Sequence, residues 1–168
     1  MILGILSDSH GRVEMVRRAL AELDAAGAQV FVHCGDVGGL DVLDELAGRR
    51  AWFVWGNTDE PRPLWRPHVA ELGLPWPDGP VELALAGRSI GVYHGHERAF
   101  REALRDARFD YLLHGHTHQR NDYREGPMRV INPGALHRVA LPTVAVLNLE
   151  RDDLRFLTIG QERAGLTI

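Results

Sequence analysis

The sequence predicts an α/β fold of the α+β kind, in which two mixed β-sheets pack as a sandwich flanked by helices. Two observations predict it. Residues 2 to 55 alternate strand-like and helix-like stretches, which is typical of parallel strands joined by right-handed crossovers. The stretches after residue 120 alternate or run apolar with turns between them, so this part is expected to be all β, and the total is enough strands for two sheets. The 168 residues fit one domain, 1–168.

The N-terminal third is expected to form a βαβαβ unit. The stretches ILGIL, VFVHC and AWFVW are short apolar runs, typical of buried strands. Two stretches with apolar residues at helical spacing predict helices, and Gly27 ends the first of them. The strands cover residues 2–6, 30–34 and 51–55, and the helices cover residues 13–26 and 40–47.

Residues 61–80 interrupt this alternation, because they hold six of the nine prolines together with Trp65 and Trp76. Proline fixes φ and removes a backbone donor, so no long regular element is expected here. Two interpretations stay open. The segment is an ordered surface loop held by its tryptophans, or it forms a rim of the active site or an oligomer contact.

The remaining elements follow from the same patterns. VELAL (81–85) and RSIGVYH (88–94), joined by Ala86 and Gly87, are typical of a hairpin. RAFREALRDA (98–107) predicts a helix and DYLLHG (110–115) a strand. Four more strands are expected at NDYRE, MRVIN, TVAVLNL and LRFLTI.

Composition excludes several classes of protein. The net charge of −4 argues against a protein that coats duplex nucleic acid. All 19 basic residues are arginines, whose planar fork suits small anions, although genomic base composition equally explains the lack of lysine. The single cysteine, Cys34, allows no internal disulfide, so a cytoplasmic location is expected. The opening run MILGIL is too short for a signal-peptide core or a membrane span.

Polar side chains follow five of the expected strands where each strand ends. Ligands bind beyond the carboxyl ends of strands in α/β sheets, so these side chains are expected to converge. Each alone has a simpler reading: Asp8 or Ser9 as a helix cap, Asp36 and Asn57 as turn residues, His94 as a hydrogen-bonded histidine. The residues are Asp8, His10, Asp36, Asn57, Asp59, His94, His96, His116 and His118.

Imidazole and carboxylate groups without a thiolate set suit Zn, Mn, Fe or Ni. One ion takes four to six ligands, whereas seven candidates are present, which fits two ions that share one carboxylate; Asp36 is the natural bridge. Two divalent ions would leave excess positive charge that favours an anionic ligand such as a phosphodiester, clamped between metals roughly 4 Å apart. The seven are Asp8, His10, Asp36, Asn57, His94, His116 and His118.

Five short motifs stand in a characteristic order: DSH (8–10), GD (35–36), GNTD (56–59), an isolated strand-end His94, and GHTH (115–118). In this order they resemble the motifs of the calcineurin-like metallophosphoesterase superfamily. The NPG at 132–134, followed by strands, is similar to the small single-domain bacterial and archaeal phosphodiesterase branch. The resemblance implies a two-sheet sandwich with a dinuclear metal site.

By matching position, Asp8, His10 and His118 would hold one metal, Asn57, His94 and His116 the other, and Asp36 would bridge. His114 matches no ligand position and is expected to be structural. His33, His68 and His137 match no motif and are expected to be structural or exposed.

Two departures from the family pattern matter. Many members carry a histidine directly after the motif asparagine, thought to protonate the leaving group; Thr58 stands there in this chain. His96 is an alternative acid, or it is a loop histidine that faces solvent. The sequence GDVGGLD also lacks the Asp-Arg-Gly of the phosphoprotein phosphatase branch, which disfavours protein phosphatase activity.

The resulting hypothesis is a phosphodiesterase in which water bridging two divalent metals attacks a small phosphodiester. Asp36, Asn57 and His94 are the expected catalytic residues, with Asp59 and His96 as further candidates. Asn57 and His94 would also bind substrate, with Thr58 and His96 beside them. Manganese is the first expectation for the metal, with Zn, Fe, Ni or Mg open.

Three alternatives remain. One eukaryotic member of the superfamily, a subunit of an endosomal coat, uses the fold to bind proteins. The second alternative is a nuclease and the third a phosphomonoesterase, both of the same superfamily. A homo-oligomer is left open; a membrane or duplex nucleic acid partner is not expected.

Overall fold

Two five-stranded sheets form the centre of the computed structural model, which describes residues 1–160. The first sheet has the order β10-β9-β1-β2-β3, and β1 pairs parallel to β2 and antiparallel to β9. Its strands are β1 (Ile2–Leu6), β2 (Val30–His33), β3 (Ala51–Phe53), β9 (Thr143–Asn148) and β10 (Asp153–Thr158). The expected parallel βαβαβ unit is therefore confirmed as three neighbouring strands of this sheet.

The second sheet has the order β4-β5-β6-β8-β7. Strands β5, β6 and β8 are parallel, and the hairpins β4–β5 and β7–β8 are antiparallel at its two edges. The strands are β4 (Val81–Leu85), β5 (Arg88–Val92), β6 (Tyr111–Leu113), β7 (Asn121–Glu125) and β8 (Met128–Asn132). Both sheets are mixed, as predicted.

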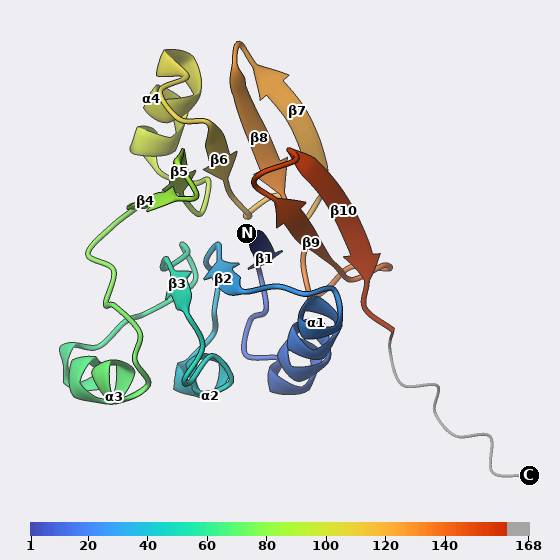
Figure 1. Cartoon of the computed structure of the whole chain (residues 1–168). Helices are drawn as coiled ribbons and strands as arrows, with labels where there is room; N and C mark the ends of the chain where they lie inside the picture. Colours follow the sequence, from blue (N-terminus) through green and yellow to red (C-terminus); the bar gives the residue numbers. More distant parts are fainter. Residues whose placement is uncertain (161–168) are drawn as a thin grey trace, which may run out of the picture.

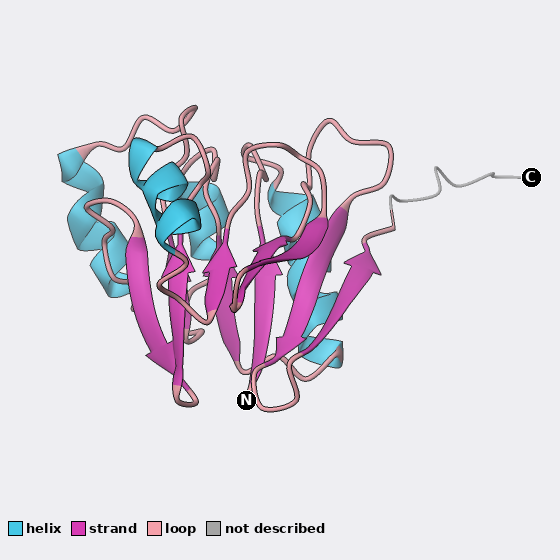
Figure 2. Cartoon of the chain, turned by 90° about the horizontal axis from the view of Figure 1, so that it is seen from above, coloured by secondary structure: helices cyan, strands magenta, loops and turns pink. Residues whose placement is uncertain are grey.

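Helices cover the outer faces of the two sheets, as Figures 1 and 2 show. Helices α1 (Val13–Ala25), α2 (Leu40–Asp44) and α3 (Arg66–Glu71) lie on the first sheet, and α4 (Arg98–Asp106) lies on the second (Figure 1). The predicted 40–47 helix ends three residues early. Segment 61–80 contains α3 and a short 3₁₀ helix, η1 (Pro63–Trp65), neither of which was predicted.

Three buried apolar clusters separate these layers. Period-two alternation in β1 places Leu3 and Ile5 between the two sheets, while Val16 and Leu23 of α1 pack against the outer face of the first sheet. Phe100 of α4 packs against the outer face of the second sheet. Burial of apolar surface, which stabilises the fold by about 25 cal/mol per Å², packs the layers against one another. The packed layers bring the ends of their strands together. No helix within residues 1–160 has the length and apolar character needed to span a bilayer.

Candidate metal centre

The loops that follow β1, β2, β3, β5 and β6 meet at one place, at the carboxyl ends of the parallel strands. Backbone hydrogen bonds continue the strand pairing into these loops: the amide of Asp8 donates to the carbonyl of Gly35 at 3.0 Å, and that of His10 to the carbonyl of Asp36 at 2.9 Å. Across the second sheet, the amide of Gly115 donates to the carbonyl of His94 at 2.9 Å. The side chains are thus presented by extensions of strands rather than by free loops.

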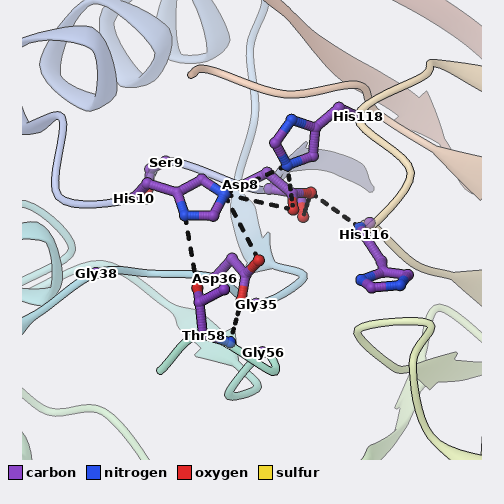
Figure 3. Close-up of polar contacts among 12 residues, drawn as sticks. Asp8, Ser9, His10, Gly35, Asp36, Gly38, Gly56, Thr58, His116 and His118 are labelled. Atoms are coloured by element: carbon purple, nitrogen blue, oxygen red, sulfur yellow. Dashed lines mark hydrogen bonds and ion pairs between the residues drawn. The ribbon is translucent and has the colours of Figure 1, made fainter. Parts of the chain in front are cut away.

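One compact cluster joins Asp8, His10, Asp36 and His118, with ligand atoms all within 4.8 Å of one another (Figure 3). The Nε2 atoms of His10 and His118 are 3.3 Å apart. Nε2 of His118 lies 3.2 Å from Oδ1 of Asp8, and Nε2 of His10 lies 3.5 Å from Oδ2 of Asp36. Two imidazoles and two carboxylates that face one point are a ligand set for a divalent transition ion.

A second group of acceptors adjoins the first through Asp36. Nδ1 of His94 lies 2.8 Å from the carbonyl oxygen of Cys34 and donates to it, so Nε2 presents a lone pair. That Nε2 lies 3.0 Å from Oδ1 of Asn57 and 3.3 Å from Oδ2 of Asp36, which are also acceptors. When His94 is neutral, these three acceptors converge at hydrogen-bond distance, and either a proton on Nε2 or a metal ion among them satisfies them.

His116 is placed less directly. Its ring lies edge-on to that of His94, with centroids 5.1 Å apart, and its backbone amide donates to Oδ2 of Asp8 at 3.1 Å. Within residues 1–160 its ring nitrogens make no hydrogen bond. The side chain is exposed and lies next to His94, one member of the second group.

The protonation behaviour of the acidic and basic groups reflects the same crowding. Burial raises the pKa of Asp8, although the Ser7 hydroxyl donates to its Oδ2 at 2.6 Å. Burial also opposes ionisation of Asp36, but hydrogen bonds from His94 and Thr58 outweigh it and hold its pKa well below the usual range. For His94, burial disfavours the charged form, yet Asp36 and the Cys34 carbonyl raise its pKa overall.

One buried atom tests directly whether these residues suit a metal. Oδ1 of Asp8 is buried and, within the part of the chain that the structure describes, has no hydrogen-bond partner, although Oδ2 has two. A buried carboxylate oxygen without a donor costs free energy on the order of 1–3 kcal/mol or more. Because it faces Nε2 of His118, a cation between them would satisfy it, so the residues present fit a metal.

Backbone strain is concentrated at the same residues. Five of the seven candidate ligands adopt positive φ, in the left-handed region, although none is glycine: Asp8, His10, Asp36, His116 and His118. Each such residue costs about 1 kcal/mol or more, and only a surrounding structure that over-determines the conformation maintains it. The strained residues are thus the ones by which the chain leaves the strand ends and enters the loops of the cluster.

Two glycines allow the loops to approach the carboxylates. A Cβ at Gly56 would lie 2.1 Å from Oδ1 of Asp36, and one at Gly115 would lie 2.5 Å from Oδ2 of Asp8. No real Cβ makes such contacts, so any side chain there would displace the carboxylate or the loop.

The other predicted residues line or support the cluster. The amide of Thr58 donates to Oδ1 of Asp36 at 3.0 Å, and its hydroxyl lies 3.5 Å from Nδ1 of His10. The carboxylate of Asp59 accepts the amides of Val37, Gly38 and Gly56 at 2.8–3.0 Å. His96 is exposed, with ring centroids 5.4 Å from His94 and 6.2 Å from His116.

The simpler reading of Asp8 or Ser9 as a helix cap does not hold. Helix α1 has no side-chain cap, and the Ser9 hydroxyl instead contacts His33 and donates to the Val37 carbonyl. His114 is buried against Phe100, as expected of a structural residue, and burial lowers its pKa to about 4.

Residues that the sequence did not indicate also surround the cluster. His137 packs against His10, with ring centroids 5.2 Å apart, although nothing in its spacing relates it to the motifs. Glu97 accepts the amides of His94 and Gly95 at 2.8 and 2.7 Å and so fixes that loop. A cavity of about 510 Å³ lies between segment 61–80 and the loop of His96 and Glu97, so the tryptophan-rich segment borders the site.

Two helix-flanked mixed sheets with a cluster of carboxylates and imidazoles at their strand ends agree with the architecture that the sequence motifs predicted. A sequence model of the calcineurin-like phosphoesterase superfamily domain matches residues 1–152, and the chain belongs to this superfamily.

The relatives agree with this assignment over nearly the full length. A phosphodiesterase of Methanocaldococcus jannaschii is 26% identical over 167 residues, which cover 95% of this chain and 99% of the relative. A solved archaeal phosphodiesterase superposes with a TM-score of 0.83 at 24% identity, covering 94% of this chain and 99% of that one. The protein Vps29 of Entamoeba histolytica, solved with Zn²⁺, superposes with a TM-score of 0.62 at 20% identity, covering 95% of this chain and 100% of that one. The last two likenesses concern the fold.

Proposed function

We propose that this protein is a phosphodiesterase that holds two divalent ions and hydrolyses small phosphodiesters. Asp8, His10 and His118 would hold one ion, Asn57, His94 and His116 the other, and Asp36 would serve both. The single observation that carries the proposal is the convergence of Asp8, His10, Asp36 and His118 on one point, with His94 and Asn57 beside Asp36. The likeness to a curated phosphodiesterase supports the reaction class.

When bound, the ions would supply a water of lowered pKa and polarise the phosphoryl oxygens. The protein's own part is positioning. Thr58 fixes the shared carboxylate through its amide, and the Cys34 carbonyl fixes the ring and tautomer of His94. Because Oδ1 of Asn57 faces His94, its exposed amide nitrogen is left to donate to a phosphoryl oxygen, where charge develops in the transition state.

The leaving group would receive its proton from His96 or from solvent. Thr58 has no proton of suitable acidity to give, whereas His96 is exposed at the rim, next to His94. Substrates with good leaving groups are therefore expected to react fastest. Asp59 is assigned a positioning role, because its carboxylate is occupied by backbone amides.

The test combines metal analysis with assays on diester and monoester. We expect the purified protein to contain close to two transition-metal ions per chain and, after chelation and add-back of Mn, Zn, Fe, Ni or Mg, to hydrolyse bis(p-nitrophenyl) phosphate faster than p-nitrophenyl phosphate. Asp36→Asn and His118→Ala, checked for folding by circular dichroism, should lose roughly 100-fold or more in kcat/KM. A protein that binds no transition ion, or variants as active as the parent, would contradict the proposal.

The same assay separates the alternatives. A phosphomonoesterase would prefer the monoester, and a nuclease would degrade single-stranded DNA or RNA faster than the aryl diester. A pure protein-binding scaffold would cleave none of these substrates with any metal.

A further inference from the structure

A second cavity, of about 490 Å³, opens beside the metal cluster, and none of the residues that line it belongs to segment 61–80. Its walls are the start of α1, at the blue end of the chain in Figure 1, and the loop of residues 136–142 that leads into β9. None of the seven proposed metal ligands lines this cavity.

His137 joins the cavity to the metal cluster. It lines the cavity and packs against the ring of His10, which in turn lies 5.3 Å, centroid to centroid, from the ring of His118. Gly11, also in the wall, directly follows His10 in the chain. A molecule whose phosphorus lies at the metal cluster therefore has one arm within reach of this cavity.

The cavity carries a net positive charge: three arginines line it against one carboxylate, that of Glu14, which pairs with Arg17 and Arg18. Arg12 and Arg138 both line it, both are exposed, and within residues 1–160 neither forms an ion pair. Arg18 also lines the cavity, where its side chain contacts Glu14 and the Gly160 carbonyl.

Backbone donors face the same space. Helix α1 begins at Val13 without a side-chain cap, so the amides of Glu14 and Met15, both in the wall, have no acceptor within the described chain. The amino end of a 13-residue helix favours an anion through these amides and its dipole. Nδ1 of His137 is also buried without a hydrogen-bond partner among the described residues.

We propose that this cavity binds a second anionic group, of the phosphate class, on one arm of the phosphodiester substrate. The two arginine side chains and the uncapped helix amides would donate hydrogen bonds to the oxygens of a phosphate or pyrophosphate. The apolar side chains of Met15 and Val139 would pack against the carbon atoms of the substrate that join this phosphate to the scissile one. The inference rests on the proposed phosphodiesterase activity and adds to it: the preferred substrate carries a phosphate beyond the scissile one.

Two chromogenic esters that differ by one phosphate test the proposal. They are the p-nitrophenyl ester of thymidine 5′-phosphate and the same compound with a 3′-phosphate. We expect the metal-loaded enzyme to prefer the second by about tenfold in kcat/KM, a preference typical of one partly exposed arginine–phosphate site. Arg12→Gln and Arg138→Gln should each reduce this ratio roughly threefold, and the double variant should bring it close to one.

Arg151→Gln serves as the charge-matched control, because Arg151 lies in the turn between β9 and β10, at the opposite end of the first sheet. It should keep the parent ratio. A parent enzyme without preference for the 3′-phosphorylated ester, or a double variant that retains the preference, would overturn the proposal.

A binding measurement separates this inference from the proposed activity. Titration calorimetry of the chelator-treated protein with inorganic pyrophosphate reports the cavity through the difference between the parent and the double variant, because both keep the same metal cluster. The double variant should bind pyrophosphate roughly tenfold more weakly than the parent and Arg151→Gln should not. If neither ester is cleaved with any metal, the proposed function fails, and equal affinities in parent and double variant then reject the cavity as well.

Discussion

His33 shows how a single buried histidine supports the loops of the metal cluster. The side chain is fully buried, its Nδ1 accepts the amide of Gly35 at 3.2 Å, and its Nε2 lies 2.8 Å from the Ser9 hydroxyl. Nε2 must therefore carry the proton, because Nδ1 is an acceptor. A second proton would point at the Gly35 amide, and burial lowers the pKa of His33 to about 3.

This neutral histidine makes stability depend on pH. Between the unfolded pKa of about 6.5 and the folded value of about 3, the unfolded chain binds a proton at His33 that the folded chain does not. The free energy of unfolding therefore falls as pH falls through this window, by up to about 1.4 kcal/mol per pH unit, and is unaffected above it.

We expect the metal-free variant His33→Gln to lose stability less steeply than the parent between pH 6.5 and 4.5, even if it is less stable at pH 7.5. Urea denaturation of chelator-treated proteins at three pH values measures both slopes. Equal slopes would show that His33 is not the group responsible.

Gly56 gives a second test of single-residue geometry. An alanine Cβ there would lie 2.1 Å from Oδ1 and 2.3 Å from the backbone nitrogen of Asp36, so the Asp36 carboxylate must move. Gly56→Ala is expected to weaken metal binding about tenfold or more, in the range seen when groups that orient metal ligands are lost. Gly79→Ala is the matched control, since a Cβ there meets nothing within 4 Å. Metal titrations that do not distinguish the two variants would contradict the expectation.

The sequence indicated which residues converge but not how they are held. Asp, His and Asn at consecutive strand ends predicted the gathering, because parallel strands present their carboxyl ends at one edge. The left-handed backbone at Asp8, His10 and Asp36 depends on packing between loops and has no signature in one sequence. His137 was missed for the same reason, since only the path of the loop before β9 brings it to His10.

At the scale of elements, Asp59 ties the loop after β2 to the loop after β3. Its carboxylate accepts amides from Val37 and Gly38 in one loop and from Gly56 in the other. Asp36 and Asn57 come from these two loops, so the position of one side chain relative to the other depends on Asp59.

Asp59→Asn is expected to place an amide NH₂ against at least one of these amides. The free energy of unfolding should drop by about 1–3 kcal/mol, and the metal affinity should drop about tenfold. At saturating metal, kcat should return to the value of the parent. Asp41→Asn, at an exposed position in the first turn of α2, is the control. Denaturation, metal titration and kcat at saturating metal check these effects, and a large loss of kcat under saturation would favour a catalytic role for Asp59 instead.

Segment 61–80 shows where element prediction from sequence was incomplete. Its prolines indicated irregular structure, yet Pro63 and Pro67 stand in the first turns of η1 and α3. In a first turn the missing N–H has no partner to lose and the fixed φ suits the helix, so proline starts a helix there instead of preventing one. The prediction of no long element was right; the short helices escaped it because they depend on Trp55 packing against Trp76 and Trp65.

The whole molecule is divided between two sheets that contribute to one cluster. Asp8, Asp36 and Asn57 follow strands of the first sheet, whereas His94, His116 and His118 follow strands of the second. The sandwich itself was predictable from strand count and apolar periodicity, because these depend on local sequence. The alignment of the two sheets was not predictable from the sequence. It depends on the packing of side chains such as Ile5 and Ile90 in the cluster between the sheets.

Because the ligands come from both sheets, a bound metal should hold the sandwich together. Unfolding separates the ligands, so metal that binds only the folded chain stabilises it by about 2.7 kcal/mol per site at 100 times its Kd. We expect Mn²⁺ to raise the thermal midpoint of the chelator-treated protein by several degrees, at roughly 2–4 °C per kcal/mol for a chain of this size.

Asp36→Asn should lose most of this rise, because Asp36 belongs to both groups of ligands. Glu150→Gln is the control: Glu150 pairs with the chain's amino group at the opposite end of the sheet, and its variant should respond to Mn²⁺ like the parent. Differential scanning calorimetry with and without Mn²⁺ measures the three midpoints. If Mn²⁺ shifts Asp36→Asn as much as the parent, the stabilising ion binds elsewhere, and the two sheets are not joined through this cluster.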